Sequence, residues 1–190
     1  MKKINTLEQD AFEEIANIGL SKAADSLSTI VNEKVLLKTT KMGINFSKRL
    51  EQSGSQDYVV LTTHVKGEHE GTCLLIFSQE EVFNIKEKCL YNNDDKKMLE
   101  ALLLEIDNII SASVITQLAN ILDLNIYGSV PEISLLSLDD LKKHLIDMKS
   151  NYDPLLFSTN LISDNLDLEP DFFWFFKEGM LQTLQKVVNE

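Results

Sequence analysis

The step Glu-x-x-Asn occurs at corresponding places in the two halves of the sequence, at Glu14 with Asn17 and again at Glu105 with Asn108. Both copies are embedded in Glu-Ile-x-Asn-Ile, and they stand 91 positions apart in a chain of 190 residues. An asparagine amide does not titrate near neutral pH, so it can orient a water by hydrogen bonding but cannot act as a general acid or base. The neighbouring carboxylate offers a charge to a lysine or arginine of a partner. The repeat therefore indicates two copies of a site that positions a water and a partner molecule.

Each pair has the spacing of a single stripe on a helix. The stripe consists of Asp10, Glu14, Asn17 and Ser21 in the first copy and of Ala101, Glu105, Asn108 and Ala112 in the second. The Glu and Asn side chains are predicted to point to solvent. The isoleucines predicted to turn inward are Ile15 and Ile18 in the first helix and Ile106 and Ile110 in the second. The small side chains of Ala101 and Ala112 would let another protein surface approach the second pair.

The alternative interpretation is that these residues are ordinary solvated positions. Glu and Asn are common on protein surfaces, and a third copy of the step, from Glu81 to Asn84, has no counterpart in the other half. Two observations weigh against this interpretation. The main pairs share one helical phase and one place in each half, and a mid-helix asparagine costs some tenths of a kcal/mol relative to better helix formers. The shared register favours a function for both pairs.

The elements that carry the pairs are two long amphipathic helices, predicted over residues 7–31 and 96–122 from apolar periodicity. Residues 92–95 are predicted to cap the second helix, and 66–71 to connect a hairpin. The predicted strands cover residues 35–46, 57–67, 71–78, 124–133, 154–160 and 171–178, and shorter helices cover 79–90, 137–148 and the C-terminal segment. A long helix followed by strands opens each half. The pattern predicts an α+β fold with pseudo-two-fold symmetry, formed by a single domain over residues 1–190 with an internal repeat of about 1–91 and 92–190.

Composition limits the partners and the compartment. The formal net charge of −12, from 18 basic and 30 acidic residues, would repel phosphate backbones and anionic lipids, so neither nucleic acid nor a membrane is expected as a partner. No apolar stretch approaches the roughly 20 residues of a membrane-spanning helix, and the N-terminus lacks the apolar run of a secretory signal. We expect a cytoplasmic protein in which Cys73 and Cys89 are buried free thiols.

Two further groups of residues have plain interpretations. His64, His69 and His144 are scattered along the chain, so we expect solvent or loop roles for them and no metal site. Residues 172–176 are apolar at every position, which fits a strand buried on both faces better than a patch that binds a partner.

The sequence resembles the CheC, CheX and FliY family of chemotaxis phosphatases, whose signature is D/S-x3-E-x2-N-x22-P. The matching residues are Asp10, Glu14 and Asn17 in the first copy and Glu105, Asn108 and Pro131 in the second. Thr40 stands in place of the first proline, and Ala101 replaces the second Asp or Ser. The Glu and Asn are intact in both copies, and two copies in one chain make CheC nearer than CheX.

The resemblance covers essentially the whole chain and implies a CheC-like fold, with an antiparallel sheet and two equivalent long helices. It implies hydrolysis of the aspartyl phosphate of a CheY-like response regulator. Asn17 and Asn108 would orient the attacking water, Glu14 and Glu105 would pair with a lysine of the regulator, and Asp10 and Pro131 would be supporting positions.

The same resemblance sets the expected cofactors and partners. This chain is expected to bind no metal or cofactor, and Mg²⁺ is expected on the regulator. CheD is retained as an additional partner, and a monomer is preferred to a homodimer. The alternative function is a non-catalytic adaptor that binds phosphorylated CheY, CheD or a flagellar switch component.

Overall fold

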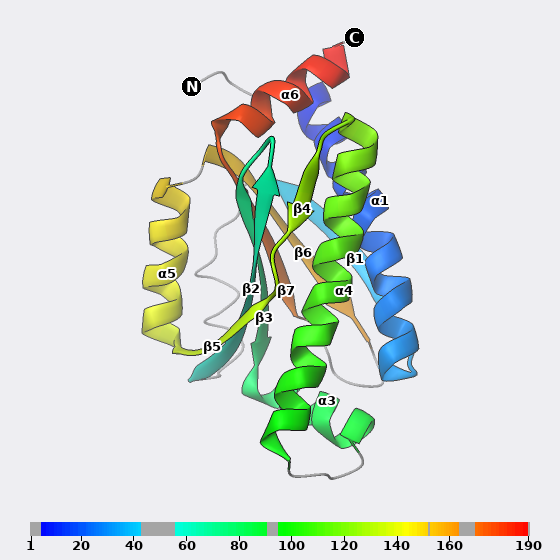
Figure 1. Cartoon of the computed structure of the whole chain (residues 1–190), viewed down its shortest axis with the longest axis vertical. Coiled ribbons are helices and arrows are strands. Elements are labelled where there is room, and N and C mark those ends of the chain that lie inside the picture. Colours follow the sequence, from blue (N-terminus) through cyan, green and yellow to red (C-terminus); the bar gives the residue numbers. More distant parts are fainter. Residues whose placement is uncertain (1–4, 43–55, 91–94, 152, 164–169, 190) are drawn as a thin grey trace.

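The structure, a computed structural model, describes residues 5–42, 56–90, 95–151, 153–163 and 170–189. The helices are α1 (Thr6–Val31), α3 (Gln79–Leu90), α4 (Lys96–Leu122), α5 (Leu138–Asn151) and α6 (Glu178–Asn189). The strands are β1 (Leu36–Met42), β2 (Asp57–Gly67), β3 (Gly71–Ser78), β4 (Ile126–Gly128), β5 (Glu132–Ser137), β6 (Asp153–Ile162) and β7 (Asp171–Phe176). They form a seven-stranded antiparallel sheet, with α1 and α4 on one face and α5 on the other (Figure 1).

The strand order is palindromic with respect to the two halves of the chain. The path runs β1-β6-β7-β3-β2-β4, and β5 continues the edge beside β2. The central strands β7 and β3 come from opposite halves, and each edge is formed by the strand that follows a long helix, paired with a strand of the other half. The predicted α+β fold with pseudo-two-fold symmetry is therefore confirmed.

The two long helices end in the same way. Asn32 follows α1 with a φ of 50°, and Asp123 follows α4 with a φ of 51°, and both adopt the left-handed conformation. The Asn32 amide donates to the Ser28 carbonyl, and the Asp123 amide donates to the Ala119 carbonyl. Asn and Asp tolerate positive φ better than other non-glycine residues. The two caps are 91 positions apart, the same offset as the two Glu-Asn pairs.

Both edge strands are irregular at equivalent positions. The pairing of β1 with β6 shifts register between Lys38 and Lys41, an interval that contains Thr40. In the other half, residues 129–131 interrupt the predicted strand 124–133 and divide it into β4 and β5. The single long strand predicted there is wrong because Pro131 has no amide hydrogen to donate to a ladder. At the start of the interruption, the Ser129 amide still donates to the His64 carbonyl of β2 at 2.7 Å.

The helices α1 and α4 lie side by side and antiparallel (Figure 1). A Cβ on Gly19 would lie only 3.3 Å from the Val114 Cα, so the backbones approach closely at this crossing. The buried face of α1 is accordingly centred on small residues such as Ala16 and Ala23. The prediction that Ile18 turns inward is wrong, since 42% of its surface is exposed, whereas Ile15 packs against the core.

Strand β7 is buried on both faces, as predicted. Phe172, Trp174 and Phe176 belong to the larger apolar cluster beneath α1 and α4, and their rings make edge-to-face contacts. Phe173 and Phe175 belong to the smaller cluster beneath α5. The sheet thus has an apolar layer on each side, and the larger layer supports the two long helices.

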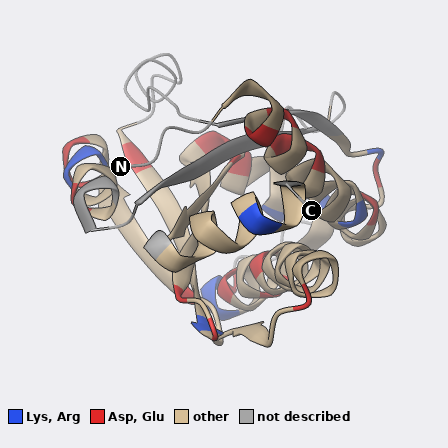
Figure 2. Cartoon of the chain, turned by 90° about the horizontal axis from the view of Figure 1, so that it is seen from above, with Lys and Arg blue, Asp and Glu red and all other residues tan. Residues whose placement is uncertain are grey.

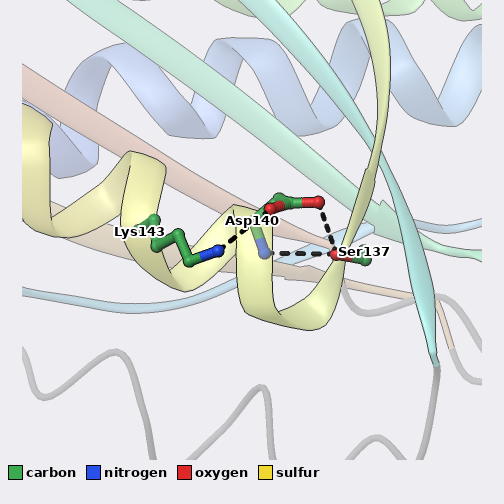
Figure 3. A network of polar contacts seen from close by, with 3 residues as sticks. All are labelled: Ser137, Asp140 and Lys143. Carbon is green, nitrogen blue, oxygen red and sulfur yellow. Dashed lines mark hydrogen bonds and ion pairs between the residues drawn. The ribbon is translucent and has the colours of Figure 1, made fainter.

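The start of α5 shows how local sequence sets a helix boundary (Figure 3). The Ser137 hydroxyl donates to the Asp140 carboxylate at 2.7 Å, and the Asp140 amide donates back to the Ser137 oxygen at 3.2 Å. Lys143 pairs with the same carboxylate at 3.4 Å. The bonds from Ser137 and Lys143 lower the pKa of Asp140. This cap pairs the Asp140 amide, one of the amides that a helix N-terminus otherwise leaves unpaired.

Two predictions fall partly outside the part of the chain that the structure describes. These are residues 43–46 of the first predicted strand and 92–94 of the predicted cap, although Asp95 does cap α4 through the Lys97 amide. No helix among the described residues is both long enough and apolar enough to cross a bilayer.

Candidate functional site

The two Glu-Asn pairs lie on the outer face of the layer formed by α1 and α4. Glu14, Glu105 and Asn108 are exposed, and so is Asp10 one turn before Glu14. Asn17 is half-buried, so the prediction of full exposure is wrong for this one residue. The helix that carries it packs tightly on α4 at Gly19, only two positions further on.

The surroundings of the two asparagines differ. In the first copy the Ser21 hydroxyl donates to the backbone carbonyl of Asn17 at 2.8 Å. In the second copy Ala101 and Ala112 are exposed on either side of the pair. Small side chains at these positions leave the backbone of α4 accessible to another protein surface.

The antiparallel packing separates the pairs into two sites. The crossing lies at Gly19 of α1 and between Val114 and Gln117 of α4. Asn17 lies two residues before this crossing on α1. Asn108 lies six to nine residues before it on α4, which runs in the opposite direction, so the two distances add. With a rise of 1.5 Å per residue, the asparagines are about 14 Å apart along the helix axes. Each pair is therefore a separate copy of the site on a shared face.

The third Glu-x-x-Asn step serves a different purpose. Glu81 lies in the first turn of α3, where its carboxylate accepts hydrogen bonds from the Ser78 amide at 2.7 Å and the Ser78 hydroxyl at 2.8 Å. The Glu81 amide donates back to the Ser78 hydroxyl at 3.3 Å. This copy of the step is a helix cap. Glu81 is thereby distinguished from Glu14 and Glu105, which lie in the middle of long helices.

Pro131 is half-buried in the connection between β4 and β5, not on α4 itself. Its counterpart Thr40 lies in the register shift of β1. Both positions therefore mark an irregularity in the edge strand that follows each long helix, whether or not proline is present. The structure places them in the scaffold that supports the helices.

Acidic residues are distributed over most elements, whereas basic residues are fewer (Figure 2). The described residues contain no group of three or more His, Cys, Asp or Glu side chains arranged to hold a metal ion. His64 and His69 are half-buried and not free in solvent: His64 Nδ1 lies 3.2 Å from the Thr72 hydroxyl, and His69 Nε2 lies 2.9 Å from the Thr183 hydroxyl. The expectation of a solvent or loop role is therefore wrong for His64, which lies within β2, but His69 does lie in the loop between β2 and β3.

Both cysteines are free thiols, as expected, but their burial differs. Cys73 is buried, and desolvation raises the pKa of its thiol well above the usual range. Cys89 is only half-buried. The prediction of two buried thiols thus applies to Cys73 alone, because Cys89 lies in the last turn of α3 at the edge of the core.

Sequence reasoning missed one residue beside the second pair, Asp107. This carboxylate is fully buried beneath α4, where it accepts hydrogen bonds from the Thr63 hydroxyl at 2.6 Å and the Ser111 hydroxyl at 3.3 Å. Burial raises its pKa to about 6, against the lowering effect of the two hydroxyls. A signal was available in the sequence, because position 107 follows Leu103 by four residues and therefore lies on the apolar stripe.

We predict that Asp107→Asn stabilises the protein at neutral pH. The folded-state pKa of about 6 exceeds the ordinary value of 3.8, so the folded state binds more protons than the unfolded state between these values. Stability therefore falls as the pH rises from about 4 to 6, and the penalty persists above that range. The rise of the pKa from 3.8 to about 6 corresponds to roughly 3 kcal/mol of lost stability at neutral pH. Asparagine should recover only part of this free energy, because burying its amide also has a cost.

The expected gain in the free energy of unfolding is about 2 kcal/mol at neutral pH and less than about 0.5 kcal/mol near pH 4. Urea denaturation at several pH values measures it. Asp25→Asn, at an exposed position of α1, is the matched control and should change little at either pH. A loss of stability at neutral pH in Asp107→Asn would show that the ionised carboxylate is favourable in the folded state.

The sequence comparisons identify relatives for most of this chain. The CheY-P phosphatase CheC of Bacillus subtilis is 30% identical over 142 residues, which cover 67% of this chain and 66% of CheC. The chain belongs to the CheC, CheX and FliY family. The flagellar motor switch phosphatase FliY of B. subtilis is 25% identical over 147 residues, which cover 73% of this chain and 38% of FliY. No protein-family profile matches the chain.

Solved structures of the CheC, CheX and FliY family share the fold. FliY of Thermotoga maritima has a TM-score of 0.71 at 18% identity, over 99% of this chain and 98% of that one. CheX of Borrelia burgdorferi, in a complex with CheY, BeF3 and Mg²⁺, has a TM-score of 0.57 at 13% identity, over 93% of this chain and all of that one. At these identities the likeness concerns the fold alone.

Proposed function

We propose that this protein hydrolyses the aspartyl phosphate of a CheY-like response regulator to give aspartate and inorganic phosphate. The observation that carries the proposal is the presence of two Glu-Asn pairs in the same register on antiparallel helices, with both glutamates exposed on the outer face. Relatives named CheY-P phosphatase and flagellar motor switch phosphatase support this reaction class.

In the proposed mechanism the asparagines act on the attacking water. Phosphoryl transfer requires in-line positioning and charge neutralisation more than covalent chemistry from the catalyst. The amide of Asn17 or Asn108 would accept and donate hydrogen bonds to a water and hold it in line with the phosphorus. A rate increase of about 100-fold requires about 2.7 kcal/mol, which one well-placed amide and an oriented complex can supply.

The glutamates would hold the regulator in register. Glu14 and Glu105 each present a carboxylate on the same helix face as the neighbouring asparagine, one turn away. A lysine of the regulator is the proposed partner of this carboxylate, and Mg²⁺ is proposed to remain with the regulator. Asp10 and Pro131 are proposed as supporting positions, Asp10 on the stripe of the first pair and Pro131 at the edge strand.

The test is the decay of a phosphorylated, Mg²⁺-loaded CheY-like protein from the same genome, followed by release of inorganic phosphate. The proposal expects substoichiometric amounts of this protein to accelerate release by about 100-fold or more. Equal rates with and without it, for every such regulator, would refute the proposed activity. Binding without acceleration would instead support the adaptor function, with phosphorylated CheY, CheD or a flagellar switch component as the partner.

The remaining proposals concern the protein as a whole. We propose that it acts as a single domain, in the cytoplasm and as a monomer. Sedimentation at several concentrations tests the oligomeric state, and the same experiment with CheD added tests that partner.

A further inference from the structure

The buried layers beneath the two Glu-Asn pairs differ in chemistry. Beneath the first pair, α1 presents the apolar side chains of Ala16 and Leu20, both buried. At the positions 91 residues later, α4 presents Asp107 and Ser111, which are buried as deeply. A carboxylate and a hydroxyl thus stand beneath the second pair at the positions where α1 carries alanine and leucine.

Asp107 connects α4 to the sheet through a directional bond. The Thr63 hydroxyl, on β2, donates to Asp107 Oδ2 at 2.6 Å, and the Ser111 hydroxyl donates to Oδ1 at 3.3 Å. The shorter distance is typical of a hydroxyl bonded to an ionised carboxylate. The surrounding side chains are apolar, and apolar contacts are non-directional. The bond to Thr63 therefore fixes the rotation and the height of this turn of α4 above β2.

The same turn carries the second Glu-Asn pair. Asn108 follows Asp107 directly and Glu105 precedes it by two residues, so their directions differ by fixed angles of 100° per residue. When Asp107 points to Thr63, Asn108 and Glu105 are held outward, as the exposure of both shows. A small rotation of this turn would displace the Asn108 amide relative to any water that it orients.

We propose that Asp107 is a positioning residue of the second site: its bond to Thr63 sets the orientation of Asn108 and makes the second site, but not the first, respond to protonation of one buried carboxylate. The inference rests on the proposed function, because it assigns a role within that site. Protonation would remove the charge-assisted bond to Thr63 and loosen the orientation of Asn108, so second-site activity should fall as the pH drops through about 6.

The groups that face Asp107 are few. The Thr63 and Ser111 hydroxyls act on it directly, and Cys73 of β3 is the titratable side chain coupled to it. The Cys73 thiol stays protonated over this range because burial raises its pKa. Among the described residues of α1, α3, α6, β4 and β5, which also pack on α4, none contributes a charge that shifts the Asp107 pKa.

The first experiment compares variants that each retain a single site. Asn17→Ala leaves only the second site, and Asn108→Ala leaves only the first. The phosphatase rate of the Asn17→Ala chain is divided by that of the Asn108→Ala chain, because this ratio cancels the pH dependence of the regulator. We expect this ratio to fall at least fivefold between about pH 7.5 and 5, and to become independent of pH when Asp107→Asn is added. A ratio that is already independent of pH would overturn the proposal.

Thr63→Val provides a second variant, since it removes the donor with little change of shape. In the Asn17→Ala chain it should lower kcat at least fivefold with KM unchanged, and in the Asn108→Ala chain it should change kcat by less than twofold. If Thr63 had only a structural role, Thr63→Val would lower kcat equally in both chains, and that result would also overturn the proposal.

A measurement on the protein alone separates this proposal from the proposed function. The side-chain amide signals of Asn108 should titrate in NMR spectra with the midpoint near pH 6 of Asp107, those of Asn17 should not, and Asp107→Asn should abolish the transition. No titration of Asn108 would overturn the positioning role even if the protein is a phosphatase. Titration in a protein without phosphatase activity would support the link between Asp107 and Asn108 and refute only the proposed function.

Discussion

A chain carrying both Asn17→Ala and Asn108→Ala is expected to lose at least about 100-fold in the rate of regulator dephosphorylation. Alanine removes the amide that is proposed to orient the water, but it leaves the helices and both glutamates in place. The loss corresponds to about 2.7 kcal/mol of transition-state stabilisation. Phosphate release measured in single turnover gives the rate. Binding to a BeF3-loaded regulator should survive because the glutamates proposed to dock the regulator are intact.

The controls for this variant use the two separate sites. Each single substitution should retain part of the activity, because the pairs lie on opposite sides of the helix crossing. Asn120→Ala, at another exposed position of α4, is the matched control and should be fully active. Stability should change by less than about 0.5 kcal/mol at the exposed Asn108 and somewhat more at the half-buried Asn17. Full activity in the double variant would refute the mechanism.

The second large effect is expected from reversing the charge of both glutamates. Glu14→Lys with Glu105→Lys places a cation opposite the proposed lysine of the regulator, so attraction becomes repulsion at both sites. We expect kcat/KM to fall by more than about 100-fold, chiefly through weaker binding, since charge pairs at interfaces contribute about 2–5 kcal/mol when disrupted. Titration calorimetry with the BeF3-loaded regulator measures the binding directly.

The control must carry the same net charge. Glu80→Lys with Glu100→Lys reverses two exposed carboxylates outside the pairs, and it should reduce kcat/KM by less than about fivefold through long-range electrostatics alone. An equal loss in both double variants would assign the effect to overall charge and would contradict a docking role for Glu14 and Glu105.

Much of the fold could be predicted because its signals are local. The helix predicted over 96–122 matches α4, and the strands predicted over 57–67 and 71–78 match β2 and β3. Apolar periodicity and β-branched runs decide such elements within a few residues of each position. The 91-residue repeat likewise predicted the equivalence of α1 and α4. The left-handed residues that end them, Asn32 and Asp123, have the same 91-residue spacing.

Local patterns failed where a distant segment decided the outcome. Ile18 has the spacing of a core residue, but the close approach of α1 to α4 at Gly19 turns the small residues inward and leaves Ile18 exposed. Local patterns also gave no partner for β4 and β5, which both pair with the distant strand β2.

The sequence by itself determined which residues form the two pairs, their spacing on each helix and their register between the halves, because 3.6-residue periodicity is a property of the local chain. Only the tertiary structure decided that α1 and α4 pack antiparallel, which places the pairs on one face as separate sites. It also decided that Asp107 meets Thr63, which lies 44 residues earlier in the chain. A buried carboxylate can be distinguished from a solvated one only by its surroundings, and those are assembled from segments distant in sequence.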